Sequence, residues 1–105
     1  MSSLQHRFNL ADVRRKIEEK DKSLRPKLMS ISEAVAKFVS NGKHIAIGGC
    51  LNTRTPSALV HEIIRQGAKN LTVSRSITGI EADILIAASA LDKVVTSWSL
   101  HTVYG

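Results

Sequence analysis

Two consecutive glycines, Gly48 and Gly49, open the segment of this sequence that is best suited to chemistry. A thiol, an amide and a guanidinium follow within five residues, from Cys50, Asn52 and Arg54. Glycines let a backbone approach a ligand closely, and their amides can point at an anion or an oxyanion. The segment matches neither the G-x-G-x-x-G dinucleotide loop nor the G-x-x-x-x-G-K-[ST] phosphate loop. It is a candidate anion-binding turn, and a tight turn without a ligand is the alternative.

The side chains near this turn each have a structural alternative to a functional role. Arg54 could hold a carboxylate or a phosphate, or it could be a solvated loop arginine. Cys50 stands where a nucleophile could stand, but no histidine neighbours it, which favours a small residue that fills space. Ser76 could bind a ligand or satisfy a turn. The candidate contacts to a substrate or to CoA are Gly48, Gly49, Cys50, Asn52, Arg54 and Ser76, and no residue is assigned as catalytic or metal-binding.

Helix and strand patterns alternate three times from Ser30 onward. Ser30 and Glu33 form an S-x-x-E capping box before the first helix, and Thr55 is expected to cap the second, with a proline in its first turn. Strands are expected over residues 44–47, 71–73 and 94–98, with a third helix over 80–88. This order predicts an α/β fold with an open, mostly parallel sheet and helices on both faces.

Ligands of open α/β sheets bind beyond the carboxyl ends of the strands. Three segments occupy that position in the expected order, namely residues 48–55, 74–78 and 97–104. The last of them contains His101, which is the one histidine retained as a candidate, because His6, His44 and His61 lie elsewhere and the four lack metal-ligand spacing.

The first 27 residues have the character of a separate arm. They carry an excess of four positive charges, out of a net charge of +6 for the chain. Asn9 can cap a helix with a thin apolar stripe and a heavily charged remainder. We therefore divide the chain into residues 1–27, a basic N-terminal helical arm and linker, and residues 28–105, the N-terminal part of an α/β domain. We expect a three-stranded sheet with an open edge to be incomplete, so the chain is either a fragment or needs a partner that completes the sheet.

Composition argues against several classes of protein. No apolar run approaches the ~20 residues of a membrane-spanning helix, and residues 1–27 have no apolar signal region. A single cysteine excludes an internal disulfide and fits a reducing compartment, so we expect a cytoplasmic protein. The basic arm has no interleaved aromatic residues and carries four acids, so neither nucleic acid nor membrane is an expected partner.

An ordered set of short matches carries a family resemblance. Residues 27–39, then Gly42 and the run from Ile45 to Gly49, resemble the opening of family I coenzyme A transferase α subunits. Arg54-Thr55-Pro56 with residues 62–67 and 70–72 is similar to the glutaconate CoA-transferase branch, and residues 83–86 and 93–95 continue the match. The family's α subunits are much longer than 105 residues, and Cys50 departs from the aromatic or small residue that often follows the two glycines.

The resemblance implies a CoA transferase that moves CoA between an acyl-CoA thioester and a carboxylic acid. A glutamate nucleophile belonging to a partner β subunit would carry CoA as a glutamyl thioester, and the α subunit's glycine loop, here Gly48 and Gly49, would lie near the substrate. It implies a hetero-oligomer and no cofactor beyond CoA as a substrate. None of Glu33, Glu62 and Glu81 is a credible nucleophile, because each is expected to be a surface or capping charge.

Residues 1–105 alone are expected to be inactive as a transferase. Two alternatives stay open. One is a CoA-thioester hydrolase or ring-cleaving enzyme of the same branch. The other is a non-catalytic interaction module that docks through the basic arm and the open sheet edge.

Overall fold

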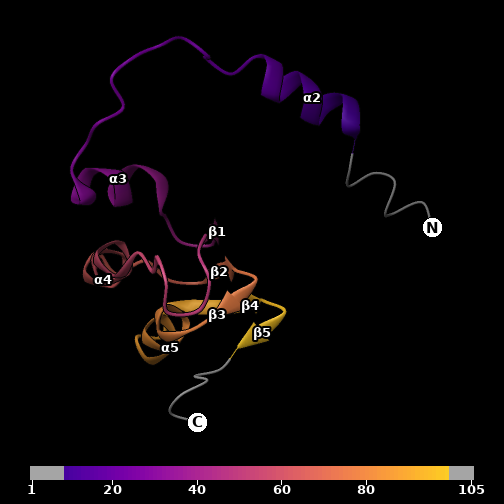
Figure 1. Cartoon of the computed structure of the whole chain (residues 1–105). Helices are drawn as coiled ribbons and strands as arrows, with labels where there is room; N and C mark the ends of the chain where they lie inside the picture. Colours follow the sequence, from indigo (N-terminus) through magenta and orange to yellow (C-terminus); the bar gives the residue numbers. More distant parts are fainter. Residues whose placement is uncertain (1–8, 100–105) are drawn as a thin grey trace.

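A computed structural model describes residues 9–99 and shows helices alternating with parallel strands (Figure 1). The elements are, in chain order, α2 (Leu10–Glu18), α3 (Ile31–Phe38), β1 (His44–Ala46), α4 (Ser57–Arg65), β2 (Leu71–Ser74), β3 (Ile77–Thr78), α5 (Ile80–Ala87), β4 (Leu91–Val95) and β5 (Trp98–Ser99). The expected α/β class with an open parallel sheet is confirmed.

The main sheet has the order β1-β2-β4, and both of its strand pairs are parallel. Its register aligns Ile45 with Val73 and Val73 with Val94. Because side chains alternate along a strand, these three lie on one face of the sheet, and Leu71, also on β2, shares that face with Val73. Leu71 and Val73 are completely buried. The core of the domain therefore lies on this face.

Three helices, α3, α4 and α5, form one layer on the core side of the sheet (Figure 1). They supply buried side chains at Val35, Val60, Ile63 and Leu85, which pack in one cluster with β2. On the opposite face, His44, Ala46 and Lys93 are exposed. In residues 9–99, helices thus cover one face of the sheet, and the cover expected on the second face is not found among them.

The capping box at the start of α3 is confirmed. The Glu33 amide donates to Oγ of Ser30 at 3.2 Å, and the Ser30 amide donates to Oε2 of Glu33 at 2.9 Å. These bonds satisfy two amides that the first turn of a helix leaves without partners. They also hold the pKa of the Glu33 carboxyl below its usual value, the backbone bond from Ser30 being the main cause.

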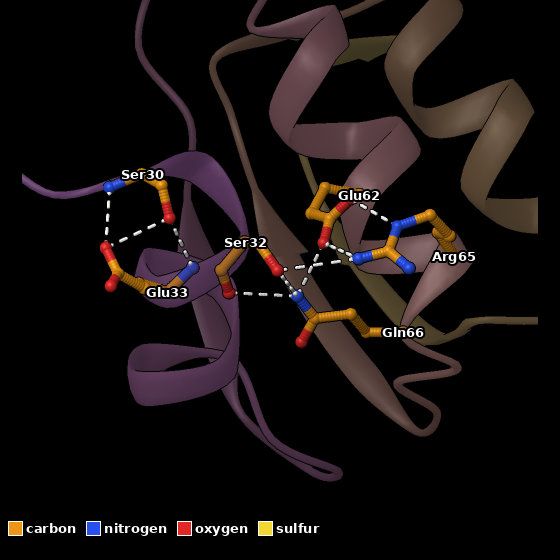
Figure 2. Close-up of polar contacts among 6 residues, drawn as sticks. All are labelled: Ser30, Ser32, Glu33, Glu62, Arg65 and Gln66. Carbon is orange, nitrogen blue, oxygen red and sulfur yellow. Dashed lines mark hydrogen bonds and ion pairs between the residues drawn. The ribbon is translucent and has the colours of Figure 1, made fainter.

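A polar network on the surface joins α3 to α4 (Figure 2). Nη2 of Arg65 lies 2.5 Å from Oε1 of Glu62, and Nε2 of Gln66 donates both to Glu62, at 2.6 Å, and to the Ser32 carbonyl, at 2.9 Å. The hydrogen bonds from Arg65 and then Gln66 lower the pKa of Glu62 to about 2. The network therefore holds an ionised carboxylate between the two helices.

The segment expected as the third strand, residues 94–98, divides between two sheets. β4 ends at Val95, and Trp98 belongs to β5, which pairs in parallel with β3. The oxygen of the Ser76 carbonyl accepts bonds from the amides of Ser97, at 3.1 Å, and Trp98, at 3.3 Å. This carbonyl turns the chain out of β4 and into the smaller sheet, so the continuous strand predicted over 94–98 is wrong.

The helix α2 stands apart from the rest of the domain, at the end of an extended connection (Figure 1). Oδ1 of Asn9 accepts from the Ala11 amide at 3.0 Å, which confirms the predicted cap. Every residue from 9 to 33 is exposed, including the apolar stripe of Leu10, Val13 and Ile17. Within residues 9–99, no helix has the length and the apolar composition to cross a membrane.

Candidate functional site

The candidate site is a loop, residues 48–55, that begins directly after β1 and is called here the glycine loop. The Ile47 amide donates to the Ser74 carbonyl at 2.9 Å, so the sheet pairing holds the chain up to the residue before Gly48. Gly49 has a φ of +91°, and a Cβ there would lie 2.6 Å from the Thr53 carbonyl oxygen. Only glycine fits position 49 without a shift of the backbone.

Short-range hydrogen bonds close the glycine loop on itself. The amide and the hydroxyl of Thr53 both donate to the Cys50 carbonyl, at 2.9 and 2.6 Å. Leu51 and Arg54 have φ values of +49° and +56°, a region that costs residues with a Cβ about 1–2 kcal/mol each. The surrounding contacts therefore have to hold this conformation.

The predicted cap of the second helix is wrong. The hydroxyl of Thr55 donates to the Leu51 carbonyl at 3.2 Å, inside the loop, and makes no capping bond. The helix α4 starts at Ser57, with Pro56 in the N-cap position and no side-chain cap. A proline N-cap offers no side-chain acceptor. The predicted N-cap position was therefore off by one residue, and the Thr55 hydroxyl bonds within the loop instead.

A buried ion pair lies beneath the glycine loop. Arg75 directly follows β2, and its Nη1 lies 2.6 Å from Oε1 of Glu81 on α5; both side chains are 0% exposed. Nη2 of Arg75 donates to the Thr53 carbonyl at 3.2 Å, and Oε1 of Glu81 accepts from the Gly79 amide at 3.0 Å. The alignment is imperfect, because Nε and Nη1 of Arg75 and Oε2 of Glu81 make no hydrogen bond within residues 9–99.

This pair corrects the expectation for Glu81, which is not a surface charge. Its bond to the N-cap amide of α5 does fit a capping role. Arg75 is absent from the residues expected at the site, although two signals in the sequence could have found the pair. Leu71 and Val73 alternate on the buried face of β2, and the same alternation puts residue 75 on that face. An arginine there needs an acid, and the first turn of α5 offers two, Glu81 and Asp83.

The predicted contacts divide between two cavities. Gly48, Gly49 and Arg54 line a largely apolar pocket of about 540 Å³ between α3, β1 and α4. Ser76 lines a second one of about 420 Å³, together with Arg75 and Ser97, at the carboxyl ends of β2 and β4. The structure therefore brings three of the six candidates together and leaves Ser76 in a separate cleft.

The remaining candidates lie on the loop surface. Cys50 is an exposed free thiol, and Asn52 is exposed with its Oδ1 3.4 Å from where a Cβ on Gly79 would be. The glycine loop thus lies over the start of α5, where glycine leaves room for it. Among residues 9–99, no three His, Cys, Asp or Glu side chains are grouped so as to hold a metal ion. His101 lies outside the described residues.

Comparison with known proteins gives a consistent result. A family model described as coenzyme A transferase matches residues 28–103. An uncharacterized protein of Archaeoglobus fulgidus is 35% identical over 89 residues, which is 84% of this chain and 20% of that protein. The A subunit of the glutaconate CoA-transferase of Acidaminococcus fermentans is 36% identical over 76 residues, 72% of this chain and 24% of the relative.

A third relative is the A subunit of the 3-oxoadipate CoA-transferase of Pseudomonas knackmussii. It is 39% identical over 71 residues, 68% of this chain and 25% of the relative. The chain therefore spans between a fifth and a quarter of the length of these curated relatives.

Proposed function

This chain belongs to the coenzyme A transferase family, and we propose that it is the N-terminal segment of an α subunit whose glycine loop holds an acyl-CoA thioester. The observation that carries the proposal is the placement of this loop. It follows the first strand of a parallel sheet, at the edge where such sheets bind ligands, and it adjoins a pocket of about 540 Å³.

The proposed chemistry is the transfer of CoA from a thioester to a carboxylic acid. The thioester carbonyl is attacked by a glutamate of a partner β subunit, and the carbonyl oxygen takes up negative charge. CoA leaves as a thiolate, attacks the resulting acyl-glutamyl anhydride, and releases the first acid while it forms a glutamyl-CoA thioester. The acceptor acid then takes CoA through the same steps in reverse. The amides of Gly48 and Gly49 are proposed to donate to the charged oxygen.

The other candidate residues have proposed roles around this centre. Arg54 lines the apolar pocket with Gly48 and Gly49, and there it could bind the distal carboxylate of a dicarboxylic substrate. The names of two relatives, which refer to glutaconate and 3-oxoadipate, support a dicarboxylate as the substrate class. Cys50 and Asn52 are proposed to contact CoA or the acid from the loop surface, and Ser76 from the neighbouring cleft.

The proposal includes a second type of chain and a cytoplasmic location. Both named relatives are the A subunits of their enzymes, which supports a hetero-oligomer with a different partner chain. Within residues 9–99, the edge strands β1 and β4 of the main sheet each pair on one side only. CoA is the only cofactor-like molecule that the proposal requires, and it acts as a substrate. The exposed thiol of Cys50 suits a reducing compartment.

The test mixes a candidate β subunit with an α subunit that carries this chain as its N-terminal segment, and it measures exchange of CoA between acetyl-CoA and glutaconate or 3-oxoadipate by mass spectrometry. We expect a new CoA ester only from the mixture, and none from residues 1–105 alone. Borohydride reduction during turnover should mark a glutamate of the partner and leave this chain unmodified. A modified glutamate in this chain, or turnover without the partner, would contradict the proposal.

The same experiment separates the two alternatives. Loss of acyl-CoA with release of free acid, without an acceptor acid, would indicate a thioester hydrolase or a ring-cleaving enzyme. A stable complex with the β subunit that binds no acyl-CoA would indicate an interaction module. The specific observation in favour of that module is α2, which lies outside residues 28–103 and exposes its apolar stripe to solvent.

A further inference from the structure

The loop that carries Gly48 and Gly49 has few ties to the body of the domain. Within the described residues, the backbone hydrogen bonds of this loop are local. The Thr53 amide donates to the Cys50 carbonyl, and the Ser57 amide donates to the Thr55 carbonyl. The bond from Nη2 of Arg75 to the Thr53 carbonyl joins the loop to the end of β2. The backbone amide of Arg75 donates to the Val95 carbonyl at 3.1 Å, so the arginine is itself fixed in the sheet.

A buried ion pair at this place needs an explanation other than stability. Two charges lose their hydration when they are buried, and apolar residues of similar volume often stabilise a core as well or better. Arg75 and Glu81 are completely covered, and their alignment leaves three polar atoms without hydrogen bonds among residues 9–99. Stability alone therefore does not account for an ion pair at this place.

The guanidinium also fits the special conformation of the loop. A Cβ on Gly49 would lie 3.0 Å from Nη2 of Arg75 and 2.6 Å from the Thr53 carbonyl oxygen, so glycine, arginine and carbonyl meet at one point. Glu81 holds the other branch of the guanidinium from the first turn of α5, where the Gly79 amide fixes its carboxylate. The fork of Arg75 thus connects the start of α5 to the turn at Gly49.

We infer that Arg75 is a positioning residue, oriented by Glu81, which sets the backbone of the glycine loop. The pair places the Gly48 and Gly49 amides without touching a substrate. Its consequence for acyl-CoA binding rests on the proposed function, but the positioning itself can be measured without acyl-CoA, so the two can fail separately.

The experiment follows amide hydrogen exchange by NMR in the full chain. In Arg75→Met/Glu81→Leu, which replaces the whole pair by apolar groups, we expect the Thr53 amide to exchange about tenfold faster or more. The amides of Leu71 and Thr72, which donate to Ala90 and Lys43 within the fold, should keep their protection. If the pair had only a structural role, its replacement would speed exchange in the loop and in the sheet together, or in neither of them.

Two further variants keep the inference falsifiable if the double variant does not fold. Arg75→Lys retains a charge beside Glu81 but has no second branch for Thr53, so it should also lose protection in the loop alone. Arg65→Met removes the exposed arginine of α4 and should leave Thr53 exchange unchanged. The inference would be overturned by an Arg75 variant in which the sheet amides keep their protection and the Thr53 amide exchanges as slowly as in the unmodified chain.

Discussion

Two Arg–Glu pairs of almost equal length occupy opposite environments in this domain. Arg65 and Glu62 on α4 are 2.5 Å apart with side chains 65% and 13% exposed, whereas Arg75 and Glu81 are 2.6 Å apart and fully covered. Arg65 is open to water, which can replace a lost partner, and Figure 2 shows this pair beside Ser32 of α3. No solvent reaches the buried pair, so each of its charges depends on the other. The distance between the charged atoms alone therefore says little about what either pair contributes to the stability of the fold.

The largest expected effect comes from breaking the buried pair on one side only. Glu81→Leu leaves the Arg75 charge buried without a partner, which we expect to lower the free energy of unfolding by about 3–5 kcal/mol. Urea denaturation followed by circular dichroism measures this loss. Glu62→Leu is the matched control in the exposed pair and should be far milder. Equal losses from the two variants would show that the environments do not differ as the structure indicates.

The next effect concerns the turn that rests on Arg75. Gly49→Ala forces a Cβ into a backbone with φ of +91° and to within 2.6 Å of the Thr53 carbonyl oxygen. We expect a loss of about 1–3 kcal/mol in the free energy of unfolding, as is usual for strained positions. Gly48→Ala is the control, because a Cβ there meets nothing within 4 Å. A loss from Gly48→Ala as large as that from Gly49→Ala would contradict the close packing on Arg75.

A smaller effect is expected on the exposed side, at the start of α3. Ser30→Ala removes the acceptor for the Glu33 amide and should cost about 1 kcal/mol of unfolding free energy, the usual value for a lost N-cap. The same urea titration measures it, and Ser30→Asp, which restores an acceptor, should recover most of the loss. A cost as large as that of Glu81→Leu would mean that the exposed contacts of α3 are coupled to the core.

The sequence predicts the features of this fold that depend on neighbouring residues better than the buried polar contacts between distant ones. The caps at Asn9 and Ser30 and the strand over 71–73 follow from local patterns, because each depends on neighbours a few residues apart. The Arg75–Glu81 contact depends on how β2 and α5 pack together, which no local pattern contains. The split of residues 94–98 between two sheets depends likewise on the distant Ser76 carbonyl.

The candidate site shows the same division. The glycine pair and its place after the first strand follow from sequence, because a turn with a positive φ favours glycine and the glycine is visible in the sequence. The cap at Thr55 was misplaced, because a hydroxyl before a proline can bond either to the helix or back into the loop, and only the folded loop offers the Leu51 carbonyl. The separation of Arg54 from Ser76 into two cavities is likewise a property of packing.

The smallest expected effect is a pH dependence that belongs to the exposed pair. The hydrogen bonds from Arg65 and Gln66 lower the pKa of Glu62 from 4.5 to about 2 in the folded chain. A lowered pKa means that the carboxylate stabilises the fold above about pH 5 and that this contribution is lost as the pH falls toward 2. The difference in unfolding free energy between the unmodified chain and Glu62→Gln should therefore shrink across that window and be constant above it. If the difference in unfolding free energy stays constant down to about pH 2, Arg65 does not hold Glu62 ionised. The exposed pair would then contribute no charge interaction to compare with that of the buried pair.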